Sequence, residues 1–270
     1  MLHDFTCASL GKIKDRVFRL GLSATYWPGK KTIYRALDAG VNYFFFYGFD
    51  AQMTRTLREV LQKNREQYVV ATGAYNLIWW RQDLRKTLEK RLRQLGTDYI
   101  DVFHFLGVMK PKEITSEVRD GLAALRQDSR VRGVAISCHD RKFAGQLAAR
   151  GDLDVLMARY NAAHRGAETE IFPYLAEHQV GLVSYTATRW RYLLRRPKNW
   201  PKDGRVPTAG LCYRFVLSNP NVDVCMNAPS NLKHLEENLA ALREGPLSPE
   251  DMDFMRKFGD AVHERHKRFL

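Results

Sequence analysis

Short apolar runs alternate with amphipathic segments along nearly the whole chain. The runs are rich in β-branched and aromatic residues and lie at 19–27, 42–48, 68–75, 99–108, 133–139, 154–161, 181–188 and 222–228. Each run is nearly continuous in hydrophobicity, which is typical of a parallel sheet whose outer face is covered. The pattern therefore predicts eight buried strands.

The segments between these runs predict helices at 30–40, 52–63, 81–96, 116–128, 140–151, 168–179, 208–220 and 231–245. Glycine tolerates the positive φ that follows many helices. Four of the segments end at a glycine: Gly40, Gly96, Gly151 and Gly245. A further helix is expected over 248–266, with Ser248 as its N-cap and acidic residues in its first turn.

Eight strands that alternate with eight helices close more naturally into a barrel than into an open sheet. No linker, repeat or low-complexity segment divides the chain. We therefore expect an α/β fold, a (β/α)₈ TIM barrel in one domain over 1–270 with an additional C-terminal helix. In such barrels the chemistry lies at the C-terminal ends of the strands.

Composition is that of an ordinary globular protein, with 45% hydrophobic and 27% charged residues in 270. No apolar run approaches the ~18 residues that a membrane span needs. The N-terminus lacks the pattern of a signal peptide, so a cytoplasmic location is expected. The four cysteines, Cys7, Cys138, Cys212 and Cys225, form no CxxC pair, which favours reduced, mostly buried thiols and no metal site.

The net charge of +13, with a pI near 9.7, is compatible with nucleic acid, a membrane surface or an anionic small ligand. Much of the charge lies on helix faces, and the densest stretch is 189–205. No nucleic-acid-binding motif accompanies the charge. We therefore expect a small-molecule ligand, with anions among the candidates, and leave the oligomeric state open.

Four passages carry a resemblance to a known family. They are LRQLGTDYIDVFHFL (92–106), VRGVAISCHD (131–140), RYNAAHRGAE (159–168) and VDVCMNAPSNLKHLEENLAAL (222–242). In this order and spacing they resemble the aldo/keto reductase family over nearly the whole chain. The resemblance implies a barrel that reduces carbonyls with NAD(P)H through an aspartate, a tyrosine, a lysine and a histidine.

Only the tyrosine of that set has a counterpart here. Tyr47, followed by Gly48, fits it if the preceding loop is shorter, whereas Phe45, Gly73 and Leu106 stand at the positions of the other three. A neighbouring ammonium makes a tyrosine a stronger acid by stabilising the phenolate, and general acid catalysis contributes ~10²–10⁴-fold. We therefore expect a divergent member with an eroded catalytic tetrad.

The resemblance also implies positions for a nicotinamide cofactor, NADP or NAD. They are Ser137 at the amide, Tyr185 against the ring, Asn161 after the sixth strand, Arg189 near the pyrophosphate, and Glu237 and Asn238 at the adenine. Ala228, Pro229 and His234 stand where basic or hydroxyl groups hold the 2′-phosphate, so selectivity for NADP is expected to be weak.

Other side chains could supply the missing chemistry. Inward positions repeat every two residues along a strand, so His104 is expected one layer below Leu106. His104 and His139 are candidate proton carriers because imidazole titrates near neutrality. Arg159 lies inside a strand, where a guanidinium needs an anionic partner.

Three functions remain open. The first is a non-standard NAD(P)H-dependent oxidoreductase acting on a carbonyl or hydroxyl, with Tyr47, His104, His139 and Arg159 as catalytic candidates. The second is a cofactor-independent lyase, dehydratase or isomerase on the same barrel. The third is a catalytically inactive binding protein. Trp79, Trp80 and Trp190 are candidates to line the mouth of a ligand site.

Overall fold

The barrel expected from the strand pattern is present. The computed structural model describes residues 5–77 and 80–265. Within them, eight parallel strands form the barrel: β3 (Leu20–Ser23), β4 (Tyr43–Phe45), β5 (Val69–Leu77), β7 (Ile100–Val108), β8 (Val131–Cys138), β9 (Val155–Arg159), β10 (Gly181–Tyr185) and β11 (Val224–Asn227). Each pairs with its neighbour in chain order, and β11 pairs with β3 to close the ring.

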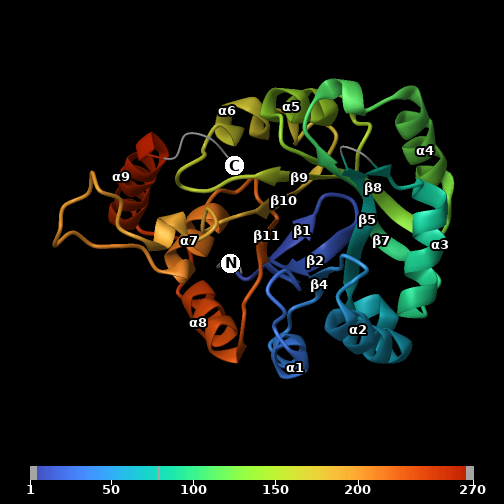
Figure 1. The fold of residues 1–270 in the computed structure, drawn as a ribbon, viewed down its shortest axis with the longest axis horizontal. Helices are drawn as coiled ribbons and strands as arrows, with labels where there is room; N and C mark the ends of the chain where they lie inside the picture. The colour runs from blue at the N-terminus through green and yellow to red at the C-terminus, as the bar shows by residue number, and fades with distance from the viewer. Residues whose placement is uncertain (1–4, 78–79, 266–270) are drawn as a thin grey trace.

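Helices surround the strands (Figure 1). They are α1 (Lys30–Asp38), α2 (Ala51–Asn64), α3 (Leu84–Leu95), α4 (Ser116–Gln127), α5 (Arg141–Arg150), α6 (Ala167–Glu170), α7 (Ala209–Leu217), α8 (Leu232–Arg243) and α9 (Pro249–Arg265). Gly96 and Gly151 end α3 and α5 in the left-handed conformation, with φ of 61° and 67°. Ser248 Oγ accepts a hydrogen bond from Asp251 N at 3.1 Å, so the expected N-cap of α9 is confirmed.

One predicted helix is wrong. The segment 168–179 forms only the single turn α6, followed by the 3₁₀ turn η3 (Phe172–Tyr174). Pro173 has no N–H to donate and disfavours helical backbone at the residue before it. The break falls at Ile171, where φ is −127° and ψ is −54°.

An N-terminal hairpin was not predicted. Strands β1 (Cys7–Leu10) and β2 (Lys14–Phe18) pair antiparallel, and β1 contacts β10. Leu10 and Val17 are fully buried and belong to the cluster inside the barrel. The hairpin therefore supplies apolar side chains to the barrel interior.

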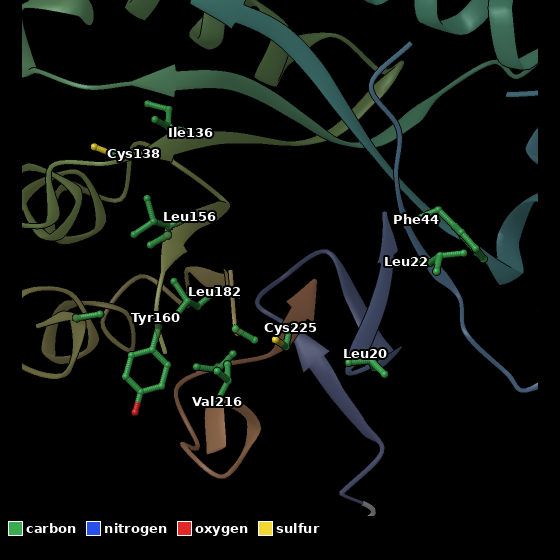
Figure 2. Close-up of a cluster of buried hydrophobic side chains, with 14 of the residues drawn as sticks. Leu20, Leu22, Phe44, Ile136, Cys138, Leu156, Tyr160, Leu182, Val216 and Cys225 are labelled. Carbon is green, nitrogen blue, oxygen red and sulfur yellow. The ribbon is translucent and has the colours of Figure 1, made fainter. Parts of the chain in front are cut away.

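Two apolar layers follow from the alternation of side chains along each strand. The inner layer includes Tyr43, Phe45, Ala71, Val102, Ala135, Val155, Met157, Val183 and Val224. The outer layer packs between strands and helices; Figure 2 shows part of it, from Leu20 and Leu22 to Leu182 and Cys225. The inward register expected from the sequence is thus confirmed, and it decides which side chains reach the C-terminal rim.

Candidate functional site

A cavity of about 600 Å³ opens at the C-terminal ends of the strands. That volume is in the usual range for small-molecule sites, about 300–1,000 Å³. Every barrel strand, or the residues just after it, contributes to the lining: Ser23, Tyr47, Tyr75, Leu106, Ser137, Met157, Tyr185 and Met226. The location is the one where TIM barrels carry their chemistry.

The floor of the cavity is apolar, and His104 lies beneath it. Phe45 and Leu106 line the cavity, while His104 is fully buried with its ring centroid 5.6 Å from that of Phe45. Its Nδ1 lies 3.3 Å from Thr72 O, and burial lowers the pKa of the imidazole to about 4. His104 is therefore neutral near pH 7 and is not among the residues lining the cavity; its catalytic assignment stays a prediction.

Tyr47 is held by hydroxyl groups at the end of β3. Its Oη lies 2.9 Å from Thr25 Oγ1 and accepts from Ser23 Oγ at 3.4 Å, and the two hydroxyls are 2.9 Å apart. The Tyr47 ring stacks on Tyr75, with centroids 6.4 Å apart and planes at 18°. The phenol thus has a fixed position in the cavity and a hydrogen-bonded hydroxyl chain behind it.

His139 and Tyr185 form a second polar pair in the cavity wall. Nδ1 of His139 lies 3.1 Å from Oη of Tyr185, and both residues line the cavity. Burial lowers the pKa of His139, and the charge of Arg159 adds to that effect. Burial raises the pKa of Tyr185. Both groups are therefore neutral near pH 7 and can exchange a proton along one hydrogen bond.

Three of the predicted residues lie beside the cavity without lining it. Asn161 is fully buried; its Nδ2 donates to Thr186 O at 2.9 Å and its Oδ1 accepts from Ala163 N at 3.0 Å. Arg159 is half-buried at the end of β9, and Arg189 is only 2% exposed. The sequence assigned Asn161 and Arg189 to the cofactor; the observed bonds of Asn161 are structural, and neither assignment is tested.

The segment after β10 forms one wall of the cavity in strained backbone. Thr186, Arg189, Trp190 and Arg191 all have positive φ, between 52° and 70°. Non-glycine residues in this conformation cluster at functional sites. The segment turns Arg191 and Trp190 into the lining, and Trp190 remains 46% exposed at the mouth. Trp79 lies outside the described residues, and the side chain of Trp80 is not described.

The far end of the cavity is lined by the beginnings of two helices. Thr208 and Ala209 begin α7, and Ser230 and His234 lie at the start of α8. Helix N-termini attract anions through their N–H groups and dipole. Glu237 and Asn238 complete this end, and Asn238 Nδ2 donates to Asn227 Oδ1 at 3.1 Å.

Some lining residues were not anticipated from the sequence. Ser23 and Thr25 lie in the second half of the run 19–27 that predicts a strand, and Ser230 precedes a predicted helix, so strand ends and helix starts were the available signals. Arg191 was noticed only as part of the basic stretch 189–205. Its entry into the cavity depends on the left-handed turn at 189–191.

None of the four cysteines forms a disulfide in the part of the chain that the structure describes, and three of them, Cys138, Cys212 and Cys225, are buried, as expected. In this part of the chain no group of three or more His, Cys, Asp or Glu side chains could hold a metal ion. None of its helices combines the length and the apolar character that crossing a membrane requires.

Comparison with known proteins gives a family match. The model of the aldo/keto reductase family matches residues 29–196 and 191–260. Among curated relatives, L-galactose dehydrogenase of Arabidopsis thaliana is 24% identical over 246 residues, which cover 79% of this chain and 77% of the relative. NADH-specific methylglyoxal reductase of Escherichia coli is 23% identical over 217 residues, covering 67% and 65%.

Solved structures show the same fold. An aldo-keto reductase from Bacillus halodurans in its holo form has a TM-score of 0.77 at 20% identity, covering 97% of this chain and 99% of its own. An aldo/keto reductase from Klebsiella pneumoniae, in complex with NADP and acetate, has a TM-score of 0.74 at 18% identity, covering 94% and 95%.

Proposed function

Because the chain belongs to the aldo/keto reductase family, we propose that it is an NAD(P)H-dependent oxidoreductase acting on a carbonyl or hydroxyl substrate, with Tyr47 as its proton donor. One observation carries the proposal. A single cavity joins Tyr47, Ser137 and Tyr185 at one end to Glu237 and Asn238 at the other. A dinucleotide needs both ends in one continuous space.

The residues present fit a nicotinamide dinucleotide. Ser137 and Tyr185 would hold the nicotinamide, and Glu237 and Asn238 the adenine. Between them, Arg191 and the starts of α7 and α8 offer positive charge and N–H groups to the pyrophosphate. Two relatives support this choice: one structural relative is complexed with NADP, and the Escherichia coli relative is NADH-specific by name.

The choice between NADP and NAD follows from the charges near the adenine end. The lining there includes Ser230, His234 and Glu237, and among the described residues that line the cavity the one lysine or arginine is Arg191. A carboxylate accepts a ribose hydroxyl and repels a 2′-phosphate. We therefore propose that NADH binds at least as well as NADPH.

A bound reduced nicotinamide would supply a hydride to the carbonyl carbon. The chain supplies the rest. Tyr47 Oη would donate a proton to the carbonyl oxygen, and the Ser23–Thr25 hydroxyls, at 2.9 Å from each other, would pass a proton from water to the resulting phenolate. The apolar floor of Phe45 and Leu106 excludes water from below. Among the described residues no lysine or arginine is hydrogen-bonded to the Tyr47 hydroxyl, so slower turnover than that of a complete tetrad is expected.

The His139–Tyr185 pair favours a second candidate function, a cofactor-independent lyase, dehydratase or isomerase. Its 3.1 Å hydrogen bond lies in the same cavity as the Tyr47 hydroxyl chain. Two acid/base groups on separate walls suffice for proton removal and return. In this case turnover would need no nicotinamide and would survive its complete removal.

A turnover assay tests the first proposal. Purified protein is mixed with NADH or NADPH and a panel of aldehydes and ketones, and oxidation of the nicotinamide is followed. We expect slow turnover that falls by ~10²–10⁴-fold in Tyr47→Phe. Tyr174→Phe, which alters a tyrosine that is 44% exposed and does not line the cavity, serves as the matched control. Equal rates in wild type and Tyr47→Phe would refute the role of Tyr47.

A further inference from the structure

The turn that carries Tyr47 is held by side chains that do not line the cavity. Gly48 N donates a hydrogen bond to Asp50 Oδ1 at 3.2 Å, and Gln94 Nε2 donates to Gly48 O at 3.0 Å. Gly48 has a φ of 90°, a conformation that residues with a β-carbon rarely adopt. The backbone next to the proposed proton donor is therefore fixed from α3 and from the residue that precedes α2.

The guanidinium of Arg91 packs against a third side of Gly48. A β-carbon at residue 48 would overlap Nη1 and Cζ of Arg91 and would lie 2.7 Å from its Nε. Arg91 belongs to α3, and its Cζ lies over the ring of Phe46, 5.6 Å from the centroid. Its Nη1 donates to Oε1 of Gln94 at 2.9 Å, and Gln94 is the side chain that binds Gly48 O. Arg91 therefore contacts both neighbours of Tyr47 in the chain.

The surroundings of Arg91 compensate its charge only in part. It is 3% exposed; among the described residues its one hydrogen bond is the one to Gln94, and its Nε has no partner. The carboxylate that acts on it is that of Asp50, which is 2% exposed and whose Oδ2 is likewise without a partner in this part of the chain. Burying a charge that is not directly paired is costly. Packing alone therefore gives no reason for an arginine at this position.

Arg91 also acts on the aromatic wall of the cavity. The ring of Tyr75 lines the cavity and stacks on Tyr47, but its Oη is buried and has no partner among the residues that the structure describes. Burial raises the pKa of this phenol, and the charge of Arg91 acts against the rise. Arg91 is thus linked to both tyrosines of the wall, to Tyr47 through the backbone of its neighbours and to Tyr75 through its charge.

We propose that Arg91 is a positioning residue for Tyr47, which fixes the backbone at 46–48 so that the phenol keeps one position in the cavity. The inference rests on the proposed reductase function. Arg91 is not among the residues that line the cavity, so it acts through Tyr47 and does not touch the substrate. A displacement of about 1 Å at a reacting group can lower the rate by about 10²-fold. A rigid turn beneath Tyr47 is therefore a reason to keep a buried guanidinium here.

Arg91→Met separates positioning from support of the fold. The variant keeps an unbranched side chain and removes the charge and the bond to Gln94. We expect kcat to fall about 10–100-fold, with unchanged KM for the carbonyl and unchanged Kd for NADH. Its urea midpoint should be no lower than that of wild type, because a buried charge is removed. An unchanged kcat would overturn the proposal, and so would a fall in kcat accompanied by a lower urea midpoint.

Two further variants make the result specific. Arg93→Met makes the same change at an exposed position of the same helix and should keep the wild-type kcat. Gln94→Leu removes the bonds to Arg91 and to Gly48 O, and it decides if Arg91→Met does not fold. We expect Gln94→Leu to lower kcat as Arg91→Met does, and the double variant to be no slower than either, because both act on one turn. Losses that multiply in the double variant would contradict a shared role.

A measurement without turnover separates this inference from the proposed function. The protein is labelled with 3-fluorotyrosine, and the fluorine resonance of Tyr47 is identified by its loss in Tyr47→Phe. In the cofactor-free protein we expect Arg91→Met to shift or broaden this resonance and Arg93→Met to leave it unchanged. A shifted resonance in a protein that reduces no carbonyl would refute the proposed function and still support the positioning of Tyr47. An identical Tyr47 resonance in wild type and Arg91→Met would overturn the inference, even in an active reductase.

Discussion

Gly73 faces the backbone of His104 so closely that a β-carbon at residue 73 would lie 2.0 Å from His104 O. The two residues are direct partners in the β5–β7 pairing. A side chain at residue 73 therefore requires the two strands to move apart. The position that the family resemblance gives to a lysine is closed here by the backbone itself.

Gly73→Ala should destabilise the protein. Forcing a methyl group against a rigid backbone carbonyl costs about 1–3 kcal/mol of unfolding free energy. Gly133→Ala is the matched control, because the nearest atom to its β-carbon is the terminal methyl of Ile13, a side chain that can move. Urea unfolding measures both. A Gly73→Ala variant as stable as wild type would show that the strands accommodate the side chain.

Gly73→Lys should not restore efficient reductase turnover, because the same backbone contact keeps the ammonium from a family-like position. Steady-state kinetics would show a rate at or below that of wild type. An increase of tenfold or more, with the fold intact by circular dichroism, would contradict the account of the closed position.

The buried imidazole of His104 should make the protein less stable in mild acid. Its folded-state pKa of about 4 lies below the unfolded value of 6.5. Between these values the unfolded chain binds a proton that the folded chain does not, so stability falls as pH drops from 6.5 towards 4. His104→Gln should reduce that loss by up to about 2 kcal/mol between pH 7.5 and pH 5.

Urea unfolding at the two pH values measures this difference. His178→Gln, which replaces a partly exposed imidazole, is the control for the loss of a histidine side chain. The pKa of His164 is also lowered. His164 is present in wild type and in His104→Gln, so the difference in pH dependence between these two proteins reports on His104. An identical pH dependence in His104→Gln would refute the neutral, buried state.

The hydroxyl chain behind Tyr47 should affect turnover and not cofactor affinity. Thr25→Val keeps the shape of the side chain and removes the hydroxyl at 2.9 Å from Tyr47 Oη. We expect kcat to fall about tenfold, within the range of proton-transfer effects, with an unchanged Kd for NADH. Thr188→Val makes the same change at another threonine that lines the cavity, and its kcat and Kd serve as the comparison. A change in Kd alone would indicate a binding role.

Much of the fold could be predicted from the sequence, because eight apolar runs that alternate with amphipathic segments match the eight strands and surrounding helices of a closed barrel. The family resemblance pointed to Tyr47, Ser137 and Tyr185, and all three line the cavity at the rim. The N-terminal hairpin could not be predicted this way, because its strands are short and partly polar. The predicted helix over 168–179 does not form because Pro173 interrupts the segment, although its apolar residues have helical spacing.

The candidate site was less accessible to sequence reasoning. Residues 189–191 adopt the left-handed conformation, and this turn decides which arginine of the 189–205 stretch enters the cavity. Sequence patterns do not predict such φ values for arginine and tryptophan. The turns that follow β9 and β10 are joined by the carbonyl of Thr186, which accepts hydrogen bonds from Asn161 Nδ2 and Arg189 N. This contact is tertiary, so the sequence pattern does not reveal it.

Equilibrium titration shows whether the large cavity holds a nicotinamide dinucleotide. Purified protein is titrated with NADH and with NADPH while nicotinamide fluorescence is followed, and Asn238→Ala is run in parallel. We expect saturable binding, NADH at least as tight as NADPH, and weaker binding in the variant. No fluorescence change and no Tm shift with either cofactor at millimolar concentration would contradict it.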